Sequence, residues 1–323
     1  MNPTESKQVW SSHCQEDDDV PVFMQPWWWD ITAGEEHWEV VLAQSKKQSI
    51  LGALLYAQKQ FFGVKRLTLP VFTPINGVWF SKHDTDKAHS FYSKRRKILS
   101  QIIRQLPRAA FHDFKLHYTL EDWLPFKWAG YKQTTQYTQT LDLTPDETTL
   151  YEAFKGGTRS KINKVRERFE MVEIKDIKRF LDHINRVAAF KNIPYTKQNL
   201  HTIGRLHQEI EQRDLGTILA AKDEKGDIHA MIYIVFSAGT AHYWLGGAHP
   251  EFRDTNGMFF LLWEAIKKSK SRAGVFDFDG SNHPNIAPVF TGFGAIPQSN
   301  HYIYRSKNLF YKILRQIINK DGG

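Results

Sequence analysis

Residues 242–294 read HYWLGGAHPEFRDTNGMFFLLWEAIKKSKSRAGVFDFDGSNHPNIAPVFTGFG, and this stretch decides our interpretation of the fold. A strand-like run ends in two glycines, a polar loop with Arg253 follows, and an apolar helix begins near residue 258. A second strand-like run at 275–278 then leads into Asp279. A helix N-terminus offers unpaired N–H groups and the positive end of its dipole to an anion. The stretch therefore predicts an anion site and the chemical centre of the chain.

The composition is that of a globular protein with room for two domains. The chain has 323 residues, of which 41% are apolar and 24% charged. No run approaches the ~20 apolar residues of a membrane helix, and the N-terminal sequence has no basic and apolar signal pattern. The single cysteine, Cys14, excludes a disulfide framework within the chain. We therefore expect a cytoplasmic protein.

The net charge of +8 suggests an anionic partner, which charge alone does not specify. A CoA-type cofactor, an acyl-tRNA and a phosphate-bearing lipid surface all fit. The charge is unevenly distributed, because residues 15–19 (QEDDD) are acidic whereas residues 155–168 hold six basic residues and one acidic residue. The second segment is therefore a candidate binding element.

The pattern of strands and helices predicts an α+β fold with layered α/β character. Residues 1–19 are predicted to be a flexible polar leader, and the tryptophans of PVFMQPWWWDI (21–31) to be core residues. An amphipathic helix is expected at 91–106, with the basic run 94–97 on a solvated face, the alternative being a binding role. Thr144 and Pro145 look like a domain boundary and a helix start. We therefore expect domains at 20–143 and 144–305, followed by a C-terminal helix at 306–323.

Four phrases occur in an order that resembles a known family. They are PVFMQPWWWDI (21–31), DWLPFKWAGYKQTTQYTQTLDL (122–143), GGTRSKINKVRER (156–168) and FDFDGSNHPNIAPVFTGFGA (276–295). Together they resemble the FemAB-like acyltransferases of the GNAT (Gcn5-related N-acetyltransferase) superfamily, a bacterial, peptidoglycan-bridge-forming type with a BioF2-like acetyltransferase domain. The resemblance implies two tandem GNAT-like domains, each a mixed, mostly antiparallel sheet flanked by helices.

The resemblance also implies the activity of an N-acyltransferase that acts by direct transfer. Characterised relatives move an aminoacyl group from tRNA to an amine of a cell-wall precursor, and other GNAT members use acyl-CoA. The long helical arm of many Fem ligases has no counterpart here, so the donor stays open between acyl-CoA and aminoacyl-tRNA. The alternative is a GNAT-fold protein without transfer activity that binds an anionic ligand, such as RNA or an envelope precursor.

The basic cluster after residue 155 is the first candidate site. A helix beginning near Thr158 would place Arg159, Asn163 and Arg166 on one side and Lys161 and Lys164 on another. Arginine and lysine both suit phosphates, arginine also through its bidentate fork. We predict contact with the donor or an anionic acceptor, the alternative being a solvated basic helix.

The loop at 253–257 is the second candidate site. Arg253, Asn256 and Gly257 resemble a GNAT pyrophosphate loop, although Asn256 and Met258 stand where that loop has small residues. Gly257 would permit one close backbone approach to a ligand. A capped helix N-terminus is the alternative explanation.

The third candidate is a pair of acids beside a strand end. Asp277 and Asp279 are two residues apart, which places them on one face of a strand and favours separated pKa values. One of the pair is predicted to be the general base, the alternative being that the acids orient the basic helix or cap the next segment. The resemblance to GNAT enzymes implies Tyr243 as a protonating group. Further candidates for contact with the donor or substrate are Trp244, Gly246, Ser281 and Phe293, against the alternative of structural packing. No metal motif is present, so no metal is expected.

Overall fold

The computed structural model describes residues 2–17, 19–61, 63–75, 77–82, 87–280 and 282–306. The chain divides into unit 1, which comprises Met1–Gln136 and Ser299–Gly323, and unit 2, which comprises Tyr137–Gln298. The dividing point lies inside a strand rather than at the expected boundary of residues 143 and 144. The predicted C-terminal helix lies outside the described residues except for Ser306, which ends a strand.

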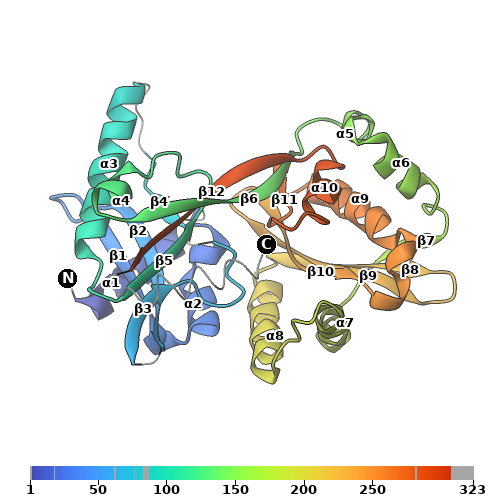
Figure 1. Cartoon of the computed structure of the whole chain (residues 1–323), viewed down its shortest axis with the longest axis horizontal. Coiled ribbons are helices and arrows are strands. Elements are labelled where there is room, and N and C mark those ends of the chain that lie inside the picture. Colours follow the sequence, from blue (N-terminus) through green and yellow to red (C-terminus); the bar gives the residue numbers. More distant parts are fainter. Residues whose placement is uncertain are drawn as a thin grey trace. The chain divides into compact units, whose positions relative to one another are not determined.

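Unit 1 combines helices of varied length with a mostly antiparallel set of strands (Figure 1). Its helical elements are α1 (Pro3–Glu16), η1 (Val22–Met24), α2 (Pro26–Thr32), η2 (Glu35–His37), α3 (Ala88–Gln105) and α4 (Leu124–Trp128). Its strands are β1 (Trp38–Gln44), β2 (Ile50–Phe61), β3 (Val64–Thr68), β4 (Val78–Phe80), β5 (Phe111–Leu116), the first part of β6 (Lys132–Asp142) and most of β12 (Ile296–Ser306). The strand order is β1-β2-β3-β5-β12, with β4 also paired to β2.

The predicted flexible leader is wrong, because most of it forms α1. Asn2 and Glu5 form a capping box, in which each side chain accepts a hydrogen bond from the other residue's backbone N–H. Trp10 is 0% exposed and its indole N–H donates to the carbonyl of Met24 at 3.1 Å. One large buried aromatic residue therefore fixes a helix whose remaining sequence is polar.

The hydrophobic core of unit 1 confirms two expectations from the sequence. Trp28 and Trp29 are both 0% exposed, so they are core residues as predicted. The amphipathic helix α3 buries Ile98, Leu99 and Ile102 against the strands. In the part of the chain that the structure describes, no helix combines the length and apolar character needed to cross a bilayer.

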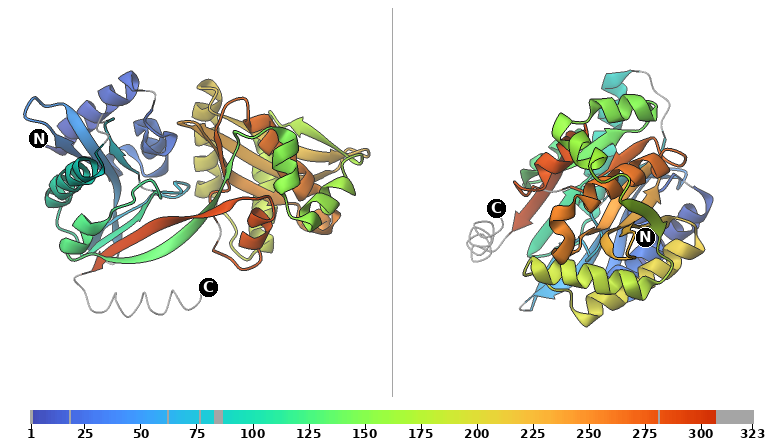
Figure 2. Two further views of the ribbon diagram at one scale, coloured as in Figure 1. Left: turned by 90° about the horizontal axis from the view of Figure 1, so that it is seen from above. Right: turned by 90° about the vertical axis from the view of Figure 1, so that its right-hand side faces the viewer.

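Unit 2 places helices on both faces of its sheet (Figures 1 and 2). Its helical elements are α5 (Glu147–Ala153), α6 (Gly156–Asn163), α7 (Ile177–Phe190), α8 (Lys197–Gln212), η3 (Pro250–Thr255), α9 (Gly257–Ser269) and α10 (Ala287–Thr291). Besides the second part of β6, its strands are β7 (Phe169–Glu173), β8 (Gly216–Asp223), β9 (Ile228–Ser237), β10 (Thr240–Ala248) and β11 (Val275–Asp277). Helices α7 and α8 cover one face, and α5, α6, α9 and α10 lie on the other.

The strand order in unit 2 brings the two halves of the decisive stretch together. The order is β6-β11-β10-β9-β8-β7, and all neighbours with a described register are antiparallel except β10 and β11, which are parallel. Helix α9 makes this crossover and buries Phe260, Leu261 and Ile266 in the core beneath it. The expected α+β class with mixed, mostly antiparallel sheets flanked by helices is confirmed.

Candidate functional site

Strands β10 and β11 separate after only three paired residues. Thr240 pairs with Val275, Ala241 with Phe276 and His242 with Asp277, where β11 ends. Strand β10 continues to Ala248, paired with β9 on its other side only. The edge of β10 from Tyr243 onward is therefore not covered by β11, as expected where a ligand inserts between two strands.

An acid–histidine cluster lies where the two strands part. His242 and Asp277 are 5% and 2% exposed, and Asp279 follows in a left-handed backbone conformation with φ of 51°. This turn brings the Asp279 carboxylate to 2.9 Å from His242 Nδ1, and its backbone N–H donates to Asp277 Oδ1 at 2.9 Å. The Thr138 hydroxyl also donates to Asp277 Oδ1. The two acids thus meet through a turn, and not through strand alternation as predicted.

The pKa values of Asp277 and His242 are both raised, but for different reasons. Burial, reinforced by the charge of Asp279, raises the pKa of Asp277 from 3.8 to about 6. Burial alone would lower the pKa of His242, but the charge and hydrogen bond of Asp279, together with the charge of Asp277, hold that pKa above its ordinary value. The cluster can therefore exchange a proton in the range in which enzymes operate.

The cluster also has the spacing of a cation site, but the hydrogen bonds within it account for the same short distances. Ligand atoms of His242, Asp277 and Asp279 all lie within 4.8 Å of one another. His242 Nδ1 is already bonded to Asp279, and Asp277 Oδ1 accepts two hydrogen bonds. The other Asp279 oxygen, Oδ2, is buried and accepts no hydrogen bond from the described residues. One carboxylate oxygen is thus left for an N–H donor.

The predicted residues on β10 divide into one site candidate and two structural residues. The half-buried Tyr243 lies on the uncovered part of β10, and burial raises the pKa of its phenol, which stays protonated. Trp244 is 7% exposed at a β-bulge and packs on Tyr233, so it belongs to the core. Gly246 has φ of 137°, and a Cβ there would lie 2.3 Å from the Met231 carbonyl. A glycine is therefore required at position 246 by the backbone conformation and by the close approach of the Met231 carbonyl.

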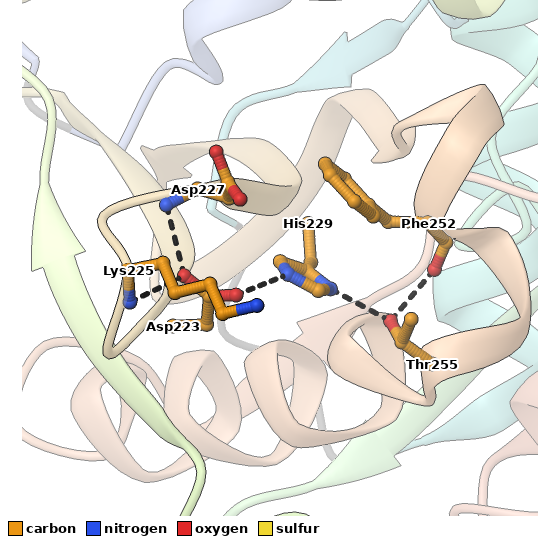
Figure 3. A network of polar contacts seen from close by, with 6 residues as sticks. All are labelled: Asp223, Lys225, Asp227, His229, Phe252 and Thr255. Atoms are coloured by element: carbon orange, nitrogen blue, oxygen red, sulfur yellow. Dashed lines mark hydrogen bonds and ion pairs between the residues drawn. The ribbon is translucent and has the colours of Figure 1, made fainter.

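The loop between β10 and α9 is held from within by a histidine that the sequence did not single out. His229 contacts the Thr255 hydroxyl at 2.9 Å through Nδ1 and Asp223 at 3.1 Å through Nε2 (Figure 3). Its ring stacks on Phe252 at 4.1 Å, and Thr255 donates to the Phe252 carbonyl at 2.6 Å. A histidine on β9 thus fixes the backbone of a loop that was predicted to hold pyrophosphate.

The predicted loop residues have mainly structural contacts. Gly257 is buried, and a Cβ there would lie 2.9 Å from His229, so its close backbone approach is to the protein and not to a ligand. Asn256 is left-handed with φ of 62° and makes no side-chain cap. Arg253 is exposed, lies over the Phe190 ring at 5.2 Å and pairs with Asp254 at 3.5 Å. Of the three, Arg253 is exposed, Asn256 is half-buried and Gly257 is buried.

The basic cluster is less regular than predicted. Helix α6 ends at Asn163, so Arg166 does not lie on the helical stripe expected for it. Arg159 donates to the Glu152 carbonyl at 2.8 Å, and Asn163 accepts from the Tyr151 hydroxyl at 2.7 Å. Lys161 lies 4.2 Å from the centre of the Phe259 ring.

The residues of the basic cluster and the remaining predicted site residues differ in how far they are exposed. Lys161, Asn163, Lys164 and Arg166 are exposed, and Arg166 and Asn163 line an open groove of about 490 Å³ that also contains Glu147, Glu152 and Glu264. These acids give the groove mixed charge, which does not favour an anion. Phe293 is 0% exposed within the aromatic core and cannot contact a ligand as placed, which corrects the prediction for this residue. Ser281 lies outside the described residues.

Comparison with known families identifies unit 2. Residues 152–284 match the family model of an acetyltransferase (GNAT) domain, a segment that includes β10, α9 and β11. A search of curated proteins found no match. The chain therefore carries a GNAT domain that contains the acid–histidine cluster.

Comparison with solved structures identifies the fold of the whole chain. FemX has a TM-score of 0.62 at 11% identity, covering 94% of this chain and 96% of that chain. A conserved protein of unknown function from Bacteroides thetaiotaomicron has a TM-score of 0.56 at 11% identity, covering 95% and 98%. The C-terminal domain of a lysylphosphatidylglycerol synthetase from Agrobacterium fabrum has a TM-score of 0.51 at 10% identity, covering 94% and 92%. These similarities show that the whole chain shares the fold of these proteins, and they leave substrate and donor open.

Proposed function

We propose that the chain is an N-acyltransferase that moves an acyl or aminoacyl group directly to an amine, with the His242–Asp277–Asp279 cluster as its proton acceptor. The observation that carries the proposal is the position of the cluster, at the point where β10 and β11 part inside the GNAT domain. The buried Asp279 Oδ2, which accepts no hydrogen bond from the described residues, supports an amine acceptor, because an amine N–H can donate to it.

In the proposed step, the acceptor nitrogen attacks the donor carbonyl carbon. The amine proton passes to the cluster, in which Asp277 has a pKa of about 6 and is ionised near neutral pH. The new bond is C–N, and the bond that breaks joins the acyl carbon to the donor's sulfur or oxygen. The Tyr243 phenol, which burial keeps protonated, is proposed to give a proton to that leaving atom.

The donor is proposed to be acyl-CoA or aminoacyl-tRNA, seated along the uncovered edge of β10. The exposed side chains of Arg253, Lys161 and Lys164 are the cations proposed to meet its phosphates. We further propose an acceptor that is an amine of a cell-envelope precursor, which rests on the sequence resemblance to FemAB-like proteins.

The test is turnover with acyl-CoA and, separately, with aminoacyl-tRNA, using a set of small and envelope-derived amines. Asp277→Asn keeps the acceptor oxygen for Thr138 and removes the base, so kcat should fall about 100-fold or more. Asp182→Asn, an exposed carboxylate on α7, is the matched control and should leave kcat unchanged. The proposal is falsified if neither donor binds or reacts.

A second function is favoured by the loop geometry. Gly257 contacts His229, and Arg253 packs on Phe190, so the loop presents fewer free groups to pyrophosphate than expected. A GNAT-fold protein that binds an anionic ligand without transfer would fit this loop. It predicts salt-dependent binding, no acyl product, and loss of binding in Arg159→Ala with Lys161→Ala.

A further inference from the structure

Unit 1 contains a basic groove that the acyl-transfer proposal does not use. Helix α3 carries five basic side chains, at positions 94–97 and 104, and no carboxylate. Together with α4, it lines a groove of about 590 Å³ whose wall includes Arg96, Lys97, Arg104 and Trp128. Helices α3 and α4 lie side by side in unit 1 (Figure 1). This size suits a bound ligand.

The cations of this groove are only partly neutralised by the protein. Arg96 pairs with Asp122 at 2.5 Å, and its guanidinium lies 5.9 Å from the centre of the Trp128 ring. Lys97 and Arg104 are exposed and make no ion pair with any described residue. Two positive charges are therefore available to an anion, and a third is held in place beside an aromatic ring.

Trp128 is an exposed aromatic residue on the wall of the groove. Its side chain is 63% exposed, although it ends a helix whose other aromatic residue, Phe126, is 0% exposed. An exposed indole on the wall of a cationic groove is a stacking surface for a flat ring. The groove thus combines charge for phosphates with a surface for a base.

The length of the groove favours an extended polyanion. Lys97 and Arg104 are seven residues apart on one helix face, which corresponds to about 10 Å along the axis. The lining extends from His89 to Arg104, or about 22 Å. Successive phosphates of a strand can contact the two cations separately, whereas a single phosphate would have to draw both long side chains together.

We propose that this groove binds single-stranded nucleic acid, with successive phosphates on Lys97 and Arg104 and one base stacked on Trp128. Binding of this kind depends on backbone charge and stacking and needs no particular sequence. The proposal concerns unit 1 alone and does not depend on acyl transfer in unit 2.

The test is fluorescence anisotropy of the full chain with a labelled oligouridylate of about 12 nucleotides, a length within the site sizes of such proteins. Lys97→Glu with Arg104→Glu should weaken binding at least tenfold and reduce the salt slope by about 1.4, because each lost phosphate contact in a single strand contributes about 0.7. Lys46→Glu with Lys47→Glu makes the same charge change on the exposed β1–β2 turn, and should retain the wild-type slope.

Trp128 gives an independent measurement that does not alter charge. Trp128→Ala should weaken binding about tenfold, which corresponds to the loss of one stacked base, and Trp128→Phe should restore most of the affinity. Thermal unfolding of each variant shows whether it is folded, and these exposed substitutions should leave the midpoint unchanged. Four results would overturn the proposal: no binding, equal loss in the turn control, equal affinity for a duplex of the same length, or binding to anionic vesicles but not to the oligonucleotide.

Discussion

Replacing Asp277 by asparagine should change how stability depends on pH, without requiring a substrate. Asp277 is 2% exposed, and its pKa is raised from 3.8 to about 6 by burial first and then by the charge of Asp279. Asparagine keeps an oxygen that can accept from Thr138 and from the Asp279 N–H. The substitution therefore removes the titrating group and retains its hydrogen bonds.

The magnitude follows from the difference between the folded and unfolded pKa values. A group whose pKa is higher in the folded state stabilises the protein fully below its unfolded pKa and loses that contribution as pH rises through the folded pKa. About 2 pKa units correspond to about 3 kcal/mol. Between about pH 4 and about pH 7, wild-type unit 2 should therefore lose about 3 kcal/mol relative to Asp277→Asn.

The assay is urea denaturation at a series of pH values for wild type, Asp277→Asn and the exposed control Asp182→Asn. The control should follow the wild-type profile, and the free-energy difference between Asp277→Asn and wild type should grow in favour of the variant as pH rises through about 6. Parallel profiles for all three proteins would refute the reasoning, since they would mean that burial does not hold a proton on Asp277.

Two further predictions concern residues that fix the fold. Trp10→Ala should lower the free energy of unfolding by about 3–5 kcal/mol, because the indole is 0% exposed. Ser12→Ala, at an exposed position of the same helix, is the control and should change it by less than about 0.5 kcal/mol. Equal effects of the two substitutions in urea denaturation would mean that α1 is not docked. Gly246→Ala should destabilise by more than about 1 kcal/mol because its Cβ would meet the Met231 carbonyl, and Gly156→Ala, where nothing lies within 4 Å, is the control. A neutral Gly246→Ala in the same assay would contradict the close approach of residue 246 to the Met231 carbonyl.

The sequence predicted those parts of the fold that depend on periodicity. The apolar spacing of Ile98 and Ile102 predicted α3, and aromatic density predicted the buried Trp28 and Trp29. It could not predict the docking of α1, because a single residue, Trp10, supplies the large buried side chain in an otherwise polar segment. The spacing of apolar residues therefore predicts an amphipathic helix face well, but it does not predict a tertiary contact made by one isolated residue.

The candidate site was predicted only in part, because several of its contacts also join residues that are distant in the sequence. Asp277 and Asp279 were singled out from their spacing, but their partner His242 lies on a parallel strand 35 residues earlier, and its pairing with Asp277 depends on sheet register. The loop was predicted from a motif, whereas the buried His229 decides how that motif folds. A single sequence does not indicate which distant residues meet through strand pairing. It also does not show which motif residues are buried, as Phe293 illustrates, because it lies in the core.

The most direct test of acyl transfer is a single-turnover reaction with acyl-CoA or aminoacyl-tRNA and an amine, followed by mass spectrometry of the acylated product. We expect product with one of the two donors, a rate that rises with pH through about 6, and a loss of about 100-fold or more in Asp277→Asn with donor affinity retained. Absence of product with both donors, or an unchanged rate in Asp277→Asn, would contradict a transferase that uses this cluster.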